Sequence, residues 1–207
     1  MENNGDNGFF GFMNKLSDII FLNLIFLLTC LPIVTIGVAL VSLHTVTLKM
    51  AKGQEGYVVR GYLKAFRANL KQGLLVGIPL EIILVVLVVD ARFLLYSTES
   101  YRDMGLMVTV IALVFLVLIM QYLFPLMARY DNSIKNTICN AALLVISKLP
   151  YTILLLIIVI IPVVLVYITP YALIYVLFAG VSVCALLQGK ILNHVFGKVE
   201  EVSENKE

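Results

Sequence analysis

The chain has 207 residues, of which 61% are hydrophobic and only 14% are charged, whereas roughly a quarter of the residues in a typical soluble domain are charged. A soluble domain of this length cannot bury so much apolar surface, so the composition indicates that lipid covers part of it. The net charge of +2 is too small to indicate a nucleic-acid partner. The composition therefore predicts an integral membrane protein.

Five apolar stretches of about 20 residues are long enough to cross the hydrocarbon core of a bilayer. They are continuously apolar and do not alternate, which predicts helices and not the strands of a barrel. Little more than Thr169 and Pro170 separates the last two, so these should form an antiparallel hairpin. We expect an all-α membrane protein with about five transmembrane helices. The predicted spans are 19–43, 73–96, 105–127, 151–168 and 171–192.

The first predicted span contains a compound helix break. Pro32 and Gly37 lie within the sequence CLPIVTIG at 30–37, and proline removes a backbone donor while glycine favours conformations outside the helix. Broken helices at membrane depth line substrate sites in some transporters. Only one span shows such a break, so the transporter signature is incomplete, and the first segment can either cross the membrane or re-enter.

The distribution of Lys and Arg predicts the orientation of the chain. If five segments alternate sides, twelve bases fall on one side, and three (Lys15, Arg92 and Arg102) fall on the other. The positive-inside rule places the richer side in the cytoplasm. We therefore expect a multi-pass cell-membrane protein with an N-terminal extracytoplasmic segment (1–18), a single helical membrane domain (19–195) and a disordered cytoplasmic tail (196–207).

The loop between the first two spans predicts an amphipathic helix at the cytoplasmic interface, over residues 57–71. Its bases fall within roughly 60° of one another on a helical projection, beside a broad apolar face. Such a stripe can bind anionic lipid headgroups, or it can dock a cytoplasmic partner such as an ATPase subunit or a kinase. The four bases are Arg60, Lys64, Arg67 and Lys71, and the apolar face consists of Val59, Tyr62, Leu63, Phe66 and Leu70.

Glu81 is the carboxylate that lies well inside a predicted span. An ionisable group near the bilayer centre is costly, so such residues usually face the bundle interior and have a partner. One interpretation is a proton- or cation-coupled site. The other is a structural hydrogen bond to Gln121, the polar residue of the third span, to Thr35, or to a backbone carbonyl freed by a proline.

Signatures of catalysis and of metal binding are missing from the sequence. It contains no GxSxG, HExxH or Walker-type motif and only two histidines, which predicts a protein that is not an enzyme and has no cofactor or metal site. Cys30, Cys139 and Cys184 are far apart and lie in apolar surroundings. We expect them to be buried thiols and not metal ligands.

Several short segments resemble the YesL-like bacterial membrane proteins, a domain family of unknown function. The resemblance covers roughly residues 9–95, and the rest of the chain is similar mainly in hydropathy. The matching segments are LNL at 22–24, CLPIVTIG at 30–37, VTLKM at 46–50, AFRANLKQ at 65–72 and DARF at 90–93.

This resemblance implies a multi-span protein of Gram-positive bacteria, of a kind often encoded beside carbohydrate importers of the ATP-binding-cassette type and beside two-component sensors. The leading expectation is a non-catalytic accessory subunit of a carbohydrate import system, with the lipid bilayer and an importer as partners. One alternative is a small transporter or channel that uses Glu81. Another is a membrane partner of a sensor kinase, and a homo-oligomer remains open.

Overall fold

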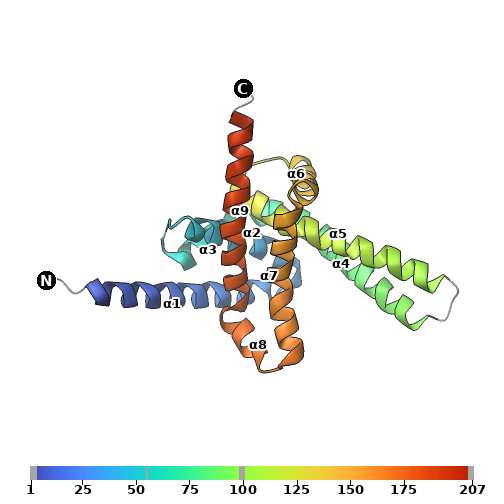
Figure 1. Cartoon of the computed structure of the whole chain (residues 1–207), viewed down its shortest axis with the longest axis horizontal. Helices are drawn as coiled ribbons and strands as arrows, with labels where there is room; N and C mark the ends of the chain where they lie inside the picture. Colours follow the sequence, from blue (N-terminus) through green and yellow to red (C-terminus); the bar gives the residue numbers. More distant parts are fainter. Residues whose placement is uncertain (1–3, 55, 98–100, 205–207) are drawn as a thin grey trace.

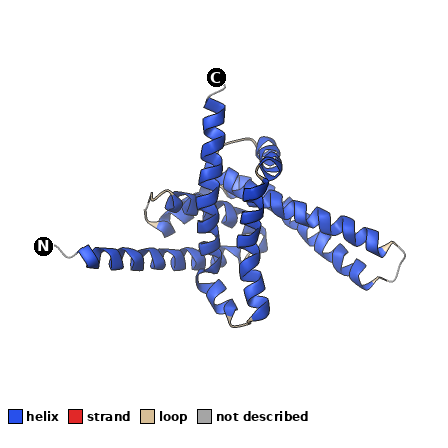
Figure 2. Cartoon of the chain, viewed as in Figure 1, coloured by secondary structure: helices blue, strands red, loops and turns tan. Residues whose placement is uncertain are grey.

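The computed structural model of the protein describes residues 4–54, 56–97 and 101–204, and within these ranges the chain is helical, with no strand (Figure 2). The all-α class is therefore confirmed. The elements in chain order are α1 (Asn4–Cys30), the 3₁₀ turn η1 (Ile33–Thr35), α2 (Ile36–Ala51), α3 (Val58–Ala68), α4 (Leu70–Tyr96), α5 (Arg102–Arg129), α6 (Ile134–Ser147), α7 (Leu149–Ile168), α8 (Ala172–Tyr175), the π turn η2 (Val176–Gly180) and α9 (Val181–Glu204).

Six helical stretches in the described part of the chain are long and apolar enough to cross a membrane. They comprise α1, α2, α4, α5, α7 and the stretch from α8 to α9 (Figure 1). The protein is thus a multi-span helical membrane protein, and the predicted number of about five spans was close. The difference arises at 19–43, where two helices replace the single predicted span.

α1 and α2 form an antiparallel pair around the predicted break. Apolar side chains of the two helices pack in one cluster, with Leu22 and Phe26 of α1 against Ala39 and Leu43 of α2. Ile19 of α1 also lines a hollow together with Met50 at the end of α2. The middle of α1, around Ile19, therefore lies beside the end of α2.

α2 is the central helix of the protein. It contacts α1, α3, α4, α5 and α9, and 56% of its apolar stretch is buried, against 11–22% for the other five. A glycine in α9 allows that helix to approach α2 closely. A Cβ on Gly189 of α9 would lie 3.1 Å from the carbonyl oxygen of Thr47, so a glycine lets the two backbones come together, as small residues do between membrane helices.

The last two spans form the predicted hairpin, but the second leg contains a π turn. η2 leaves backbone groups without their usual helical partners, and the fully buried side chain of Asn23 in α1 binds them. Its amide group donates to the carbonyl oxygens of Val176 (3.2 Å) and Leu177 (2.6 Å), and its Oδ1 accepts from the backbone N–H of Ser182 (2.9 Å). Asn23 therefore fastens α1 to the start of α9.

The C-terminal segment differs from the prediction. Residues 196–204 continue α9 as helix and are not disordered, because Glu200 contacts the end of α5 as described below. Residues 205–207 lie outside the described residues. The apolar segment before the fourth span is a separate helix, α6, whose first turn is capped by Ser133 Oγ accepting from the N–H of Asn136 (3.4 Å).

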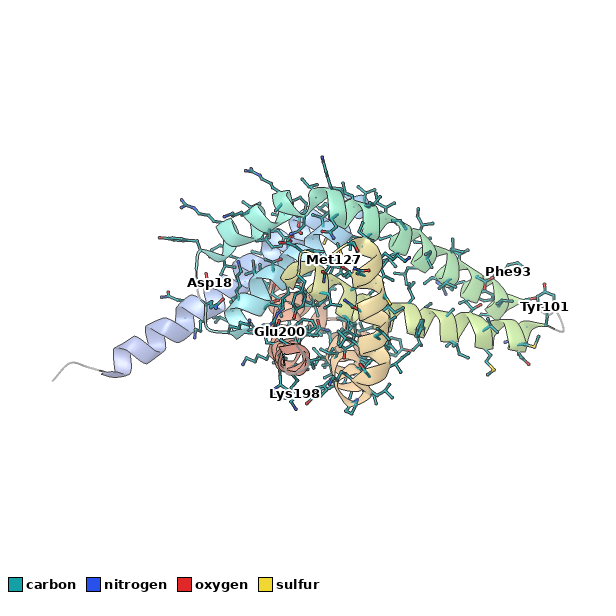
Figure 3. The ribbon with its side chains drawn as sticks, turned by 90° about the horizontal axis from the view of Figure 1, so that it is seen from above. Asp18, Phe93, Tyr101, Met127, Lys198 and Glu200 are labelled. Carbon is teal, nitrogen blue, oxygen red and sulfur yellow. The ribbon has the colours of Figure 1, made fainter. Side chains whose placement is uncertain are left out.

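α4 and α5 form a hairpin that projects from the rest of the molecule (Figure 1). Phe93 and Tyr101 mark its far end in Figure 3, away from Met127 and Glu200. Near that end the hydroxyl of Thr109 donates to Asp90 Oδ2 (2.6 Å). The polar group of Asp90 thus has a partner within the hairpin, and the large apolar side chains around it are exposed, as lipid-facing surface requires.

Candidate functional site: an exposed basic surface and a capped helix break

The four predicted bases are exposed, but they belong to two helices. Arg60, Lys64 and Arg67 lie on α3, which ends at Ala68, whereas Lys71 lies in the first turn of α4. The prediction of one continuous helix over 57–71 was therefore wrong, because the helix is interrupted before Lys71. The separation occurs at Asn69, the residue between the two helices, whose side-chain amide donates to the carbonyl oxygen of Ala65 (2.9 Å). We call these four residues the basic surface.

α3 is held against the bundle by its apolar side. Tyr62 is fully buried, and Val58 and Ala65 are buried beside it. The hydroxyl groups of Tyr62 and Thr29 are hydrogen-bonded (2.6 Å), so α3 is fixed to α1 one turn before the break. Burial raises the pKa of Tyr62 above the usual tyrosine value. The basic surface therefore has a defined position on the protein.

Part of the predicted apolar face of α3 packs against the rest of the protein, and part of it is exposed. Tyr62 packs inside and stacks with Phe66, with 6.2 Å between ring centroids. Val59 and Leu63 are exposed. Part of the apolar face predicted for an interfacial helix is therefore used to bind α3 to α1 and α2.

The helix break is confirmed at Pro32. α1 ends at Cys30, a 3₁₀ turn follows, and α2 begins at Ile36. Thr35 stabilises this turn, because its hydroxyl lies 2.5 Å from the carbonyl oxygen of Thr29 and 2.7 Å from that of Pro32. The start of α2 is thereby positioned against α4.

Gly37 makes the contact with α4 at the level of backbone atoms. A Cβ on this residue would lie 2.6 Å from Cα of Gly77 and 2.9 Å from the carbonyl oxygen of Gly73. The spacing of the two α4 glycines, four residues apart, is typical of close helix packing in membranes. Gly37 is therefore a packing residue.

Glu81 lies on α4, one turn beyond Gly77, and its half-buried side chain faces the start of α2. Its Oε1 accepts a hydrogen bond from the backbone N–H of Gly37 (3.2 Å). The first N–H groups of a helix have no partner within the helix, and the helix dipole favours a negative charge there. Glu81 thus acts as a cap supplied by a neighbouring helix.

The expected partners of Glu81 were wrong. Gln121 is 9% exposed, and neither its amide nitrogen nor its amide oxygen has a hydrogen-bond partner in the described protein. Thr35 uses its hydroxyl on the turn before α2. The structure therefore brings Glu81 together with Gly37, but it does not join Gln121 to either of them by a hydrogen bond.

A polar cluster at the other end of α2 was missed by sequence reasoning. Asn193 of α9 donates to the carbonyl oxygen of Leu48 (2.9 Å), and its Oδ1 accepts from Arg129 Nη1 (3.1 Å). Arg129, only 15% exposed in its side chain, forms an ion pair with Glu200 (2.9 Å). The Tyr130 hydroxyl donates to the other oxygen of Glu200 (2.5 Å). These contacts join α2, α5 and α9.

The surroundings of this cluster are aromatic. The guanidinium of Arg129 lies 5.5 Å from the ring centroid of Tyr130 and 5.3 Å from that of Phe196, within the range of cation–π attraction. Burial, followed by the bond to Glu200, raises the pKa of Tyr130. Charge and aromatic packing together hold the end of α5 against α9.

Among the described residues, no group of three or more His, Cys, Asp and Glu side chains lies in a position to hold a metal ion. Cys30, Cys139 and Cys184 are free thiols. Cys139 is exposed, so its predicted burial was wrong.

A family described as a protein of unknown function, DUF624, matches residues 19–91. The match includes the helix break, all of α2 and α3 and most of α4. No curated protein and no solved structure shows significant similarity to the chain. Fold and comparison together define a multi-span helical membrane protein with a DUF624 segment of unknown function.

Proposed function

We propose that this protein is a non-catalytic accessory subunit of a bacterial carbohydrate import system, and that the basic surface docks an acidic face of a cytoplasmic partner. The observation that carries the docking role is the attachment of α3. Because Tyr62 is fully buried and bonded to Thr29, the bases Arg60, Lys64 and Arg67 are presented by a fixed helix. A fixed array of charges favours one complementary protein surface.

The link to carbohydrate import rests on the YesL-like resemblance, and the non-catalytic role rests on the absence of catalytic motifs from the sequence. The capping bond of Glu81 favours a structural role for this carboxylate over a coupled transport site. A sensor kinase is the alternative partner for the same surface.

We also propose six crossings with both chain ends in the cytoplasm. α1 and α2 are antiparallel, and Lys15 of α1 lines a hollow together with Lys190 of α9. Lys15 then joins the basic side, and the twelve-to-three imbalance of bases becomes thirteen to two. In Figure 1 the C-terminal end of α9 and α6 lie at one end of the molecule and α8 lies at the opposite end, which supports placing α6 and the C-terminal end of α9 on the same side of the membrane.

Single cysteines at Asn4 and Ser203, in a variant whose three natural cysteines are replaced by serine, test the topology. In intact cells both should resist a membrane-impermeant thiol reagent and should react after permeabilisation. Labelling of Asn4→Cys in intact cells would contradict the six-crossing arrangement and support the five-span orientation with an extracytoplasmic N-terminus.

The docking role is tested by changing Arg60, Lys64, Arg67 and Lys71 together to Gln. We expect a copurifying importer or kinase to dissociate while thermal stability in detergent stays within a few degrees, because exposed bases contribute little to folding. The matched control replaces four other bases, Lys52, Lys135, Lys148 and Lys198, and should keep the partner. Equal losses in both variants, or an intact complex in the first, would overturn docking through the basic surface.

A further inference from the structure

A hollow of about 150 Å³ lies where α1, the end of α2, the start of α3 and α9 meet. Lys15 of α1 and Lys190 of α9 both line it. Met50 and Val58 line this hollow and also a second one of about 200 Å³, which Lys49 borders. The two hollows therefore adjoin, and we call them together the basic groove. Its lining includes none of the four residues of the basic surface.

The groove combines positive charge with an apolar floor. Lys15, Lys49 and Lys190 contribute three ammonium groups, and Asp18 contributes one carboxylate, so the lining is net positive. Ile19 and Leu186 complete the floor of the first hollow. Figure 3 shows Asp18 on α1, on the opposite side of the molecule from the hairpin tip at Tyr101.

The groove opens beside surface that suits acyl chains. Met13 and Leu16, within one turn of Lys15 on α1, are exposed, and so is Leu187, within one turn of Lys190 on α9. α1, α2 and α9 all belong to stretches that are apolar enough to span the membrane. Basic pockets between such helices bind the phosphate headgroups of anionic lipids, whereas free phosphate would make no use of the apolar border.

We infer that the basic groove binds one anionic phospholipid, with its phosphate between Lys15 and Lys190 and its acyl chains along the adjoining apolar side chains. Ammonium groups bind phosphate as point charges. The bound lipid would link α1 to α9 on the side of the molecule that carries the end of α2. This site is independent of the basic surface and of the partner proposed for it.

The test uses the full-length protein in detergent, titrated with phosphatidylglycerol and observed by native mass spectrometry. The wild type should retain one phosphatidylglycerol more tightly than phosphatidylcholine. Lys15→Gln combined with Lys190→Gln should weaken that binding about tenfold or more, because each base near an anionic headgroup contributes about fivefold. Lys15→Arg with Lys190→Arg should retain it.

Lys135→Gln combined with Lys198→Gln is the matched control and should change lipid retention by less than about twofold, because these lysines do not line the groove. Equal weakening in the control, or unchanged binding in the groove variant, would overturn the inference. So would displacement of the lipid by millimolar inorganic phosphate, which would indicate a site for the free anion. The Gln variant of the basic surface should keep the tight lipid, so failure of partner docking and failure of this site are distinguishable.

Discussion

Each end of α2 has a backbone group without a partner in the helix, and side chains of opposite hydrogen-bonding character bind the two groups. At its start the spare N–H of Gly37 is bound by a carboxylate, Glu81 of α4. At its end the spare carbonyl of Leu48 is bound by an amide, Asn193 of α9. A helix leaves donors free at one end and acceptors free at the other, and neither can stay unpaired in an apolar interior without a large cost.

The two caps differ in what surrounds them. Glu81 reaches α2 where glycines bring two backbones together, so the cap depends on close helix packing. Asn193 belongs to a chain of side-chain contacts that includes Arg129 and Glu200. The start of α2 is therefore sensitive to added volume, whereas its end is sensitive to the loss of a polar group.

The largest effect is expected from added volume at the start of α2. Gly37→Leu places side-chain atoms where Cβ alone would lie 2.6 Å from the backbone of Gly77, so α2 and α4 must separate and the Glu81 cap must break. We expect no folded protein after detergent extraction, measured by size-exclusion chromatography. Gly197→Leu, in a helix position with nothing within 4 Å of its Cβ, is the control and should remain folded. A monodisperse Gly37→Leu variant would contradict backbone-level packing.

The end of α2 should respond next most strongly. Asn193→Ala removes the partner of the Leu48 carbonyl and one partner of Arg129, and each unpaired buried group costs about 1–3 kcal/mol. We expect a loss of about 2–4 kcal/mol in the free energy of unfolding, measured in mixed micelles with increasing denaturing detergent. Asn140→Ala, at an exposed position, should cost less than about 0.5 kcal/mol. Equal losses in the two variants would remove the capping role of Asn193.

Substitution of Glu81 should reduce stability less, and it distinguishes a structural role for this carboxylate from a role in transport. Glu81→Ala should cost about 1–3 kcal/mol, because it leaves the Gly37 N–H without its acceptor. Glu81→Gln keeps an acceptor oxygen and should cost less than about 1 kcal/mol. The measurement is thermal unfolding in detergent for the two variants side by side. Purified protein that moves a labelled solute into liposomes, and stops doing so with Glu81→Gln, would favour a coupled site over a cap.

Hydropathy predicted most of the helices but not the division of the first segment. The predicted spans 73–96 and 105–127 agree with α4 and α5 to within a few residues. The run 19–43 was treated as one kinked span because Pro32 interrupts an otherwise continuous apolar stretch. Whether a chain kinks or turns back there depends on packing such as the cluster that contains Leu22 of α1 and Leu43 of α2, and periodicity alone does not predict such packing.

The sequence identified several residues of the candidate site but not the partners that they contact. Glu81 was identified because a carboxylate in an apolar run is conspicuous, but its partner is a backbone N–H, which no residue type reveals. Arg129 and Glu200 were missed because 71 residues separate them and each looks like an ordinary charge at the end of a span. The basic surface was visible as a stripe, whereas its attachment depends on Tyr62 meeting Thr29.

The smallest predicted effect concerns the hydrogen bond between Tyr62 of α3 and Thr29, which lies one turn before the break between α1 and α2. Tyr62→Phe removes the hydroxyl bonded to Thr29, and interhelical hydrogen bonds in membrane proteins average about 0.6 kcal/mol. Burial raises the pKa of Tyr62, so the neutral phenol is favoured in the folded state. Its stabilising contribution is complete below the unfolded tyrosine pKa of about 10 and is lost as the pH rises above that value.

Thermal unfolding of wild type and Tyr62→Phe at pH 8 and pH 11 tests both parts of this expectation. At pH 8 the variant should be slightly less stable than the wild type. Between pH 8 and pH 11 the wild type should lose more stability than the variant, because only the wild type must ionise a buried phenol at this position. Tyr57→Phe, at an exposed position of the same segment, controls for general alkaline effects and should follow the wild type. If Tyr62→Phe loses as much stability as the wild type between the two pH values, ionisation of the buried Tyr62 phenol is not the cause of the alkaline loss.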